Sequence, residues 1–151
     1  MPLDFEILKK GEAYPYHLLL LADETVDAIH RYLLDSIVYL VKNKNQEIGV
    51  FCLYQLDENT IELKNIAVAE AFQSKGLGSL IIDYIKGACG ENYKILVVGT
   101  ADSGHRQIQF YKNNGFVEFD IKKNFFIDNY EEPIFENGVQ LKDMLMLKYE
   151  L

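Results

Sequence analysis

Alternating and continuous apolar positions in the first half of the chain predict an antiparallel meander of strands. A short strand is expected at residues 4–9, and the strands of the meander are expected at residues 37–42, 46–56 and 61–68. Tight turns at residues 43–45 and 57–59 join the last three strands. Helical material is expected over residues 13–34, broken so that Asp23 or Thr25 caps its second piece.

Helical spacing of apolar residues returns at residues 77–89 and is followed by an uninterrupted apolar run at 94–99. Such a run is typical of a strand that is buried on both faces. The order strand, helix, strand predicts a βαβ unit. We therefore expect strands 61–68 and 94–99 to run parallel, with a right-handed connection.

The rest of the chain predicts one more helix and two more strands. The helix, residues 103–113, is expected to end at Asn114-Gly115 in a left-handed stop. The strands, 116–127 and 141–149, are joined by a long loop. The predicted fold class is α/β of the mixed α+β kind, with a twisted, mostly antiparallel sheet flanked by helices. A doubly wound sheet would need more alternation of strands and helices.

The run Gln73-Ser74-Lys75-Gly76-Leu77-Gly78 lies between the predicted strand 61–68 and the helix that follows it. Two glycines at such a turn let the backbone approach a ligand closely and direct several N–H groups to one place. The positive end of the following helix favours an anion, most often a phosphate. The run therefore predicts a site for a phosphorylated ligand.

Length and charge limit the classes of partner. A chain of 151 residues predicts one domain over residues 1–151. With 23 acidic against 15 basic side chains, the net charge is −8, which disfavours nucleic acid and anionic membrane as partners. An acidic surface favours a cationic acceptor such as an amine, although acidity also serves solubility.

Cysteines, histidines and the first residues carry weaker expectations. Cys52 and Cys89 lie far apart in apolar contexts, which predicts buried, reduced thiols. No metal is expected, because the three histidines do not cluster with acids at ligand spacing. The start of the chain lacks the basic and apolar regions of a signal peptide, and no apolar stretch reaches the ~18 residues of a membrane span. Cytoplasm is the expected compartment.

Three motifs in order resemble the GNAT superfamily, the acyl-CoA-dependent N-acyltransferases. The glycine run fits the family's Arg/Gln-x-x-Gly-x-Gly/Ala pyrophosphate loop, and residues 62–68 resemble the strand before it. Phe110-Tyr111-Lys112-Asn113-Asn114-Gly115-Phe116 resembles the family's Phe-Tyr-x-x-x-Gly-Phe helix end. The resemblance is strong over residues 49–116, and the flanks match only in the order of elements. It implies a single GNAT-like domain whose sheet splays at its two central parallel strands.

The resemblance implies acetyl-CoA as the acyl donor. Its pyrophosphate would be bound by backbone amides of Gln73, Ser74, Lys75, Gly76, Leu77, Gly78 and Ser79. Pantetheine would lie along Ile66, Ala67 and Val68, with the sheet opening after Val68. There the amide of Ile66 would stabilise the oxyanion of a tetrahedral intermediate.

Two residues are candidates for acid–base chemistry. Glu62 lies where some family members carry a catalytic glutamate, and a partly buried carboxylate suits removal of a proton from the amine, directly or through water. A solvated or paired position beside Lys64 is the alternative. Tyr111 matches the family residue that protonates the leaving thiolate, and a packed core tyrosine is the alternative. A strand bulge would re-aim Asn65 to hold a water.

One position departs from the family pattern. Many relatives carry Asn seven residues before the tyrosine, where this chain has Gly104. Asp102 and Ser103 beside it either contact pantetheine or cap the helix. Arg106 and Lys75 are candidate partners for the phosphates of CoA, with ordinary solvated surface charges as the alternative.

Acceptor specificity is expected in the segments least like the family, residues 13–34 and 125–138. The second mixes aromatic with acidic residues, and Asn129, Tyr130 and Glu136 are its candidate substrate-binding residues. A dimer contact or simple loop packing is the alternative there.

The predicted function is transfer of acetyl from acetyl-CoA to a primary amine on a small molecule or peptide, by direct attack in a ternary complex. The alternative is a non-catalytic acyl-CoA-binding sensor or regulatory protein.

Overall fold

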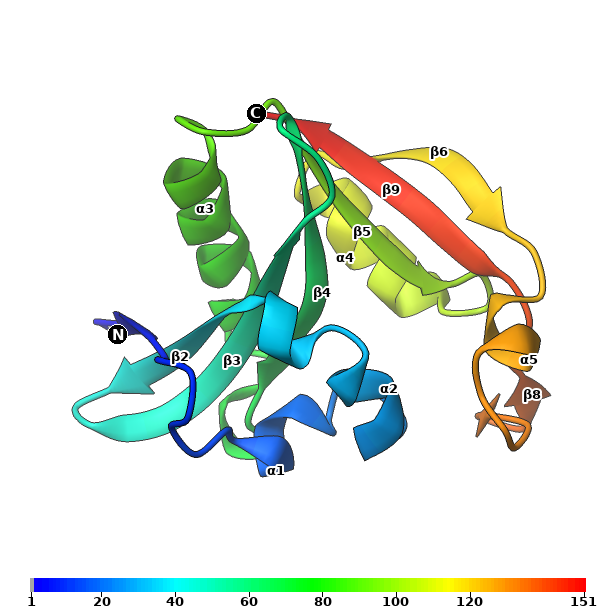
Figure 1. Cartoon of the computed structure of the whole chain (residues 1–151), viewed down its shortest axis with the longest axis horizontal. Coiled ribbons are helices and arrows are strands. Elements are labelled where there is room, and N and C mark those ends of the chain that lie inside the picture. Colours follow the sequence, from blue (N-terminus) through cyan, green and yellow to red (C-terminus); the bar gives the residue numbers. More distant parts are fainter. Residues whose placement is uncertain (1) are drawn as a thin grey trace.

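A computed structural model describes residues 2–151 of the chain and shows a seven-stranded sheet flanked by helices (Figure 1). The strand order is β1-β2-β3-β4-β5-β9-β6, and β7 and β8 form a separate two-stranded sheet. This architecture confirms the predicted mixed α/β class. No helix within residues 2–151 is both long and apolar enough to cross a membrane.

The first four strands are neighbours in the sheet, and the last three of them form the predicted meander. They are β1 (Asp4–Ile7), β2 (Ile37–Asn43), β3 (Gln46–Gln55) and β4 (Thr60–Val68), each antiparallel to the next. Their bounds lie within about two residues of those expected from alternation alone, as is usual for well-patterned strands.

The central βαβ unit also follows the prediction, and it contains the main irregularity of the sheet. Helix α3 (Leu77–Cys89) connects β4 to the parallel strand β5 (Ile95–Ala101). The two strands pair over only four positions, the last being Leu63 with Val98. The sheet was expected to open after Val68. This expectation was wrong, because pairing between β4 and β5 already ends five residues earlier.

The C-terminal part differs from the prediction at one place. Helix α4 (His105–Asn113) and the antiparallel pair β6 (Val117–Lys122) and β9 (Met144–Glu150) agree with it. The expected strand 116–127 was too long, since α5 (Phe125–Asp128) occupies its end. The expected long loop contains the hairpin of β7 (Phe135–Glu136) and β8 (Val139–Gln140). Its turn, Asn137-Gly138, has both residues at positive φ, which this sequence tolerates well.

The N-terminal helical region consists of short pieces rather than long helices. They are α1 (Tyr16–Leu19), α2 (Val26–His30) and the 3₁₀ turn η1 (Leu33–Asp35). Thr25 caps α2 as predicted, its hydroxyl accepting a hydrogen bond from the Ala28 amide at 3.1 Å. A second 3₁₀ turn, η2 (Glu70–Phe72), follows β4.

The two faces of the sheet bury separate cores. On one face, α3 and α4 pack against the sheet through residues such as Ile81, Ile85 and Tyr111. On the other, α1 and α2 cover β2–β4 through Leu18, Leu19 and other apolar side chains (Figure 1). The second core does not extend over β5, so the face beside the divergence stays available for a site.

A bulge in β4 changes which side chains face that site. Cys52 of β3 pairs with Asn65 and Leu53 with Leu63, so Lys64 is the extra residue. An extra residue shifts the alternation by one position. As a result Asn65 lies on the same face as Ala67, against the N-terminal helices. This is the re-aiming that the sequence left open.

Two glycines give a matched test of this packing. A Cβ at Gly49 in β3 would lie 2.9 Å from the Ala67 carbonyl oxygen, whereas a Cβ at Gly87 in α3 meets nothing within 4 Å. Gly49→Ala should lower the free energy of unfolding by about 1–3 kcal/mol through overpacking. Gly87→Ala should raise it by about 0.5–1 kcal/mol through helix propensity. Urea denaturation measures both, and equal effects of the two substitutions would contradict the packing described for β3 and β4.

Candidate active site

The glycine run borders a cavity of about 430 Å³ at the start of α3. Its walls combine the loop with one side of α4: Val68, Phe72, Gln73, Ser74, Gly76, Leu77, Gly78, Ser79, Arg106, Gln107 and Phe110. We call it the loop cavity. Of the loop residues predicted to bind a phosphate, all except Lys75 line it.

The loop backbone is arranged to bind an anion. Among residues 2–151, no hydrogen-bond partner is found for the backbone N–H groups of residues 74–79. Gly76 has a φ of +78°, which glycine adopts without strain, and Gln73 Nε2 fixes the loop by donating to the Val68 carbonyl at 2.8 Å. A Cβ at Gly78 would lie 3.1 Å from the Phe110 ring. Unpaired amides at a helix N-terminus suit a phosphate.

Candidate charges and polar groups near this cavity separate into two groups. Arg106 lines it, whereas Lys75 lies outside with its ammonium 5.7 Å from the centre of the Phe72 ring. Asp102 and Ser103 line neither this cavity nor its neighbour. They also do not cap α4, whose N-cap is Gly104 without a side-chain hydrogen bond. The capping alternative was therefore wrong.

A second cavity of about 350 Å³ lies where β4 and β5 diverge. We call it the acceptor cavity. The strands supply Leu63, Lys64, Asn65, Ile66, Val98, Gly99, Thr100, Ala101 and Met144. Covering segments supply Leu20, Leu21, Ala22, Asp23, Glu24, Gly104, Gln107, Tyr111, Phe126, Tyr130, Glu136 and Leu141. Gln107 lines both cavities, which therefore meet at α4. Sequence reasoning had not selected this residue.

The three predicted pantetheine contacts on β4 are divided by the alternation of the strand. Ile66 lines the acceptor cavity and Val68 the loop cavity. Ala67 is buried in the opposite core, against the N-terminal helices. The Ala67 side chain thus points away from both cavities, and only its backbone is available there.

Tyr111 lies in the wall of the acceptor cavity, one helical turn from Gln107. The residue is 7% exposed, and its ring packs edge-on against Phe110 and Phe116. No hydrogen bond to its hydroxyl is found among the described residues. Burial raises the pKa of Tyr111 above the usual phenol value, so it stays protonated at neutral pH. Tyr111 is therefore a core residue that also lines the cavity.

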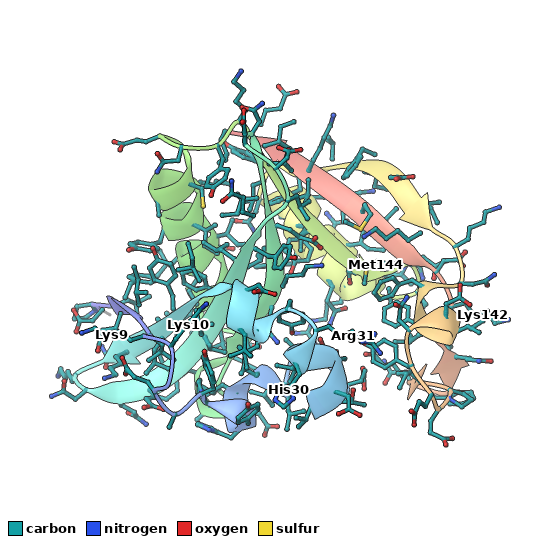
Figure 2. The ribbon with its side chains drawn as sticks, in the orientation of Figure 1. Lys9, Lys10, His30, Arg31, Lys142 and Met144 are labelled. Atoms are coloured by element: carbon teal, nitrogen blue, oxygen red, sulfur yellow. The ribbon has the colours of Figure 1, made fainter. Side chains whose placement is uncertain are left out.

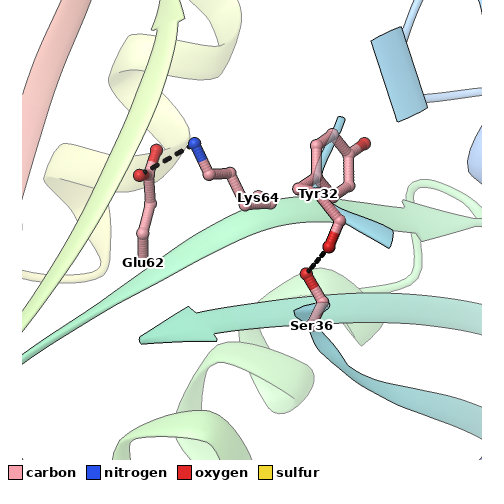
Figure 3. A network of polar contacts seen from close by, with 4 residues as sticks. All are labelled: Tyr32, Ser36, Glu62 and Lys64. Carbon is pink, nitrogen blue, oxygen red and sulfur yellow. Dashed lines mark hydrogen bonds and ion pairs between the residues drawn. The ribbon is translucent and has the colours of Figure 1, made fainter. Parts of the chain in front are cut away.

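Glu62 is buried and paired. Its Oε1 lies 3.1 Å from Lys64 Nζ (Figure 3), and its side chain is only 6% exposed. Lys64 lines the acceptor cavity, but Glu62 does not. The lysine also lies 5.5 Å from the centre of the Tyr54 ring. Glu62 therefore does not contact the cavity directly, and the lysine with which it is paired lies in the cavity wall.

Asn65 has one polar atom without a partner. Its Nδ2 donates to the Leu19 carbonyl at 3.0 Å and to the Tyr32 hydroxyl at 3.1 Å. Because a carbonyl only accepts, the Leu19 contact fixes which end of the amide is the nitrogen. Oδ1 is buried and has no partner. Buried acceptors of this kind are normally satisfied, which makes Oδ1 a candidate contact for a bound molecule.

Asp23 connects the N-terminal helices to the segment after α5. Its carboxylate accepts hydrogen bonds from the hydroxyls of Tyr32 at 3.0 Å and Tyr130 at 2.8 Å, the latter 107 residues away. The backbone of Tyr32 is held as well, because its carbonyl accepts a hydrogen bond from the Ser36 hydroxyl (Figure 3). Burial and the charge of Asp23 raise the pKa of both phenols. Asp23 and Tyr130 of this network line the acceptor cavity.

Arg31 lies behind Tyr130 and does not itself line the cavity. It follows α2 and lies opposite the α5 segment (Figure 2). Its guanidinium donates to the Asn129 carbonyl and lies 5.6 Å from the centre of the Tyr130 ring. Asn129 does not line the cavity, since its side chain donates to the Phe125 carbonyl. Of the predicted acceptor residues, Tyr130 and Glu136 line the cavity.

Two carboxyl groups lie close together at the cavity mouth. Glu24 precedes α2, Glu136 belongs to the β7–β8 hairpin, and their side chains are within hydrogen-bonding reach. Partial desolvation, the hydrogen bond and charge of Glu136, and the charge of Asp23 raise the pKa of Glu24 to about 7. Glu24 therefore gains or loses its proton near neutral pH.

Both cysteines are free and buried, as expected. Burial raises the pKa of the Cys52 thiol to about 12 and that of Cys89 to about 11. Neither is an activated nucleophile. Within residues 2–151, no group of three or more His, Cys, Asp or Glu side chains is arranged to hold a metal ion.

Asp23, Glu24, Tyr32 and Gln107 are the functional candidates that sequence reasoning missed. The acids at 23 and 24 were interpreted only as a helix break, although they lie within the segment expected to determine the acceptor. Adjacent acids next to an expected cleft were the available signal. Gln107 had none, because one polar residue on an amphipathic helix is ordinary.

The chain is similar to known proteins over most of its length. The family model described as an acetyltransferase (GNAT) domain matches residues 35–118. The uncharacterized N-acetyltransferase YvbK of Bacillus subtilis is 37% identical over 137 residues, covering 90% of this chain and 88% of that protein.

Two solved structures extend the similarity over almost the whole chain. A GNAT family acetyltransferase from Elizabethkingia anophelis, crystallised with acetyl-CoA bound, is 43% identical, with a TM-score of 0.94 and coverage of 99% of this chain and 98% of that one. A Bacillus subtilis acetyltransferase in complex with CoA is 35% identical, with a TM-score of 0.87 and 99% coverage of both chains. The family match, the identity and the shared architecture together show that this chain belongs to the GNAT family of acetyltransferases.

Proposed function

We propose that this protein, acting as one domain over residues 1–151, transfers acetyl from acetyl-CoA to a primary amine by direct attack in a ternary complex. The observation that carries the proposal is the meeting of two cavities at Gln107, one turn from Tyr111. One cavity is built for phosphates. The other has a protonated phenol in its wall and carboxylates at its mouth. A donor and an acceptor can therefore reach one point from opposite sides.

The residues of the loop cavity fit coenzyme A. Unpaired amides at residues 74–79 would bind the pyrophosphate, and Arg106 would add a charge-assisted contact. The path along Val68, Gln107 and Ile66 would hold pantetheine. The relatives from Elizabethkingia anophelis and Bacillus subtilis, which contain acetyl-CoA and CoA, support this assignment.

The chemistry requires one bond to form, one to break and one proton to move. Bound acetyl-CoA supplies a thioester: the amine nitrogen bonds to its carbonyl carbon, the carbon–sulfur bond breaks, and the proton lost by nitrogen is balanced by one gained by sulfur. The Ile66 amide is the proposed donor to the developing oxyanion, since it lies in the part of β4 that β5 no longer pairs. The buried thiols of Cys52 and Cys89 favour direct transfer over an acyl-cysteine intermediate.

Tyr111 is the proposed general acid. Its hydroxyl is protonated at neutral pH and has no competing hydrogen bond among the described residues, so it is available to the leaving sulfur. Rings on both sides hold it in place, which limits the entropy lost on reaching the sulfur.

Glu62 is the proposed base, acting through water. Lys64 stands between this carboxylate and the cavity, which disfavours direct proton removal. A water on the carboxylate would collect the proton from the amine and leave Lys64 paired.

Release of free thiol from acetyl-CoA across a panel of primary amines tests the proposed function. Amine-dependent release supports it. Tight binding of CoA without turnover on any amine would identify a non-catalytic acyl-CoA sensor instead.

Tyr111→Phe should lower kcat by about 10²–10⁴-fold, because it removes the proton donor and keeps the ring packing. The affinity for CoA, measured by calorimetry, should stay near that of the wild type. Phe116→Tyr gives a matched control for a hydroxyl change in the same aromatic cluster. An unchanged kcat for Tyr111→Phe would contradict the role of general acid.

Glu62→Gln should lower kcat about tenfold or more at neutral pH, because glutamine cannot accept a proton from the water. Steady-state rates with a saturating amine measure the change. If kcat is unchanged in Glu62→Gln, the base lies elsewhere and Glu62 serves only as the partner of Lys64.

A further inference from the structure

We propose that the acceptor is a small aliphatic diamine or polyamine. Its second, protonated nitrogen would be held by Glu24 and Glu136 at the mouth of the acceptor cavity, while the reacting nitrogen would lie at Asn65. This inference rests on the proposed function and adds the class of acceptor to it.

Charge at the cavity favours a cation. Asp23, Glu24 and Glu136 line it, and Lys64 is the basic residue in its wall. The charge of Lys64 is already balanced by Glu62 at 3.1 Å. Arg31, on the outer side of Tyr130, is occupied by the Asn129 carbonyl and the Tyr130 ring. The three carboxylates therefore lack a cationic partner among the residues of this wall.

The inner end of the cavity offers a separate polar contact. Asn65 is 4% exposed, and its Oδ1 is the buried side-chain atom without a partner in the described part of the chain. It adjoins Ile66, the proposed oxyanion donor. An N–H of a neutral amine can donate to Oδ1 while its lone pair points toward the thioester carbon. The unpartnered acceptor thus provides a place for the reacting nitrogen.

Apolar side chains form part of the wall between the two ends. Leu20, Leu21, Phe126, Leu141 and Met144 contribute there, with Met144 on β9 (Figure 2). This lining suits a methylene chain that joins two nitrogens. Lys64, the basic residue in this wall, is already paired with Glu62, and the acids at the mouth would repel a carboxylate. Amino acids should therefore be poorer acceptors than diamines of the same length.

Protonation of Glu24 at the cavity mouth should make binding of a diamine depend on pH. The groups facing Glu24 are Glu136 from the hairpin, Asp23 from its own segment, and Tyr130 and Arg31 on the far side. Below pH 7 Glu24 holds a proton and competes with the ammonium. Above pH 7 the proton is lost, repulsion between the carboxylates rises, and a cation relieves it. Binding of a dication should therefore tighten from pH 6 to 8.

Three matched amines test the class of acceptor. Pentylamine removes the second cation of 1,5-diaminopentane, and L-lysine adds a carboxylate to it. We expect kcat/KM for 1,5-diaminopentane to exceed that for either of the others by about tenfold or more, the usual effect of one hydrogen bond to a charged group. The ratio of KM for pentylamine to KM for 1,5-diaminopentane should rise from pH 6 to 8.

Variants at the mouth assign the effect to these residues. Glu136→Gln or Glu24→Gln should raise KM for 1,5-diaminopentane about tenfold, leave KM for pentylamine within about twofold, and abolish the pH dependence of the ratio. Glu91→Gln, an exposed acid after α3 that lines neither cavity, controls for the loss of one negative charge. Thermal melts verify that each variant is folded.

Calorimetry of 1,5-diaminopentane with the CoA-bound protein separates this inference from the proposed function. Binding that Glu136→Gln weakens supports the cation site even if no amine is acetylated, in which case the proposed function alone fails. Equal use of pentylamine and 1,5-diaminopentane would overturn the inference and leave the function standing. Diamine binding unaffected by both mouth variants would overturn it as well.

Discussion

Two parallel strands at the centre of the sheet stop pairing after Leu63 and Val98, and the site depends on this divergence. Backbone groups that leave a ladder must find other partners or face a ligand. Here the divergence opens the acceptor cavity and leaves Ile66 beside it. The bulge at Lys64 lies one residue beyond the last pair and turns Asn65 toward the N-terminal helices. The opening of the sheet and the change in direction of the Asn65 side chain thus arise at the same place on β4.

The cavity is closed by segments that are distant in sequence. The Asp23 carboxylate accepts hydrogen bonds from Tyr32 on one side and Tyr130 on the other. Arg31 makes a further contact between the same two segments by donating to the Asn129 carbonyl. These contacts hold the short N-terminal helices and the α5–hairpin segment together without a large apolar interface. The same contacts bring Glu24 and Glu136 to the mouth. The polar network therefore shapes the wall and sets the charge that an acceptor meets.

Periodicity sufficed for much of the fold. The bounds of α3 and the meander follow from residues whose burial repeats at the period of their element, and the phosphate loop follows from two glycines at a strand-to-helix turn. The proximity of Glu24 to Glu136 cannot be predicted from the residues around either of them, since it depends on packing between segments that are distant in sequence. The hairpin has strands too short for a pattern, and Asn137-Gly138 was its only signal. Likewise Arg106 and Lys75 look equivalent in sequence, and only the position of α4 separates them.

We propose that the loop cavity and the acceptor cavity form one path joined at Gln107. A crystal structure with CoA bound tests this most directly, because the sulfur marks where the reaction occurs. We expect the pyrophosphate on the amides of residues 74–79, pantetheine passing Gln107, and the sulfur within hydrogen-bonding distance of the Tyr111 hydroxyl. A sulfur outside the acceptor cavity, or on the far side of α4 from Tyr111, would contradict it.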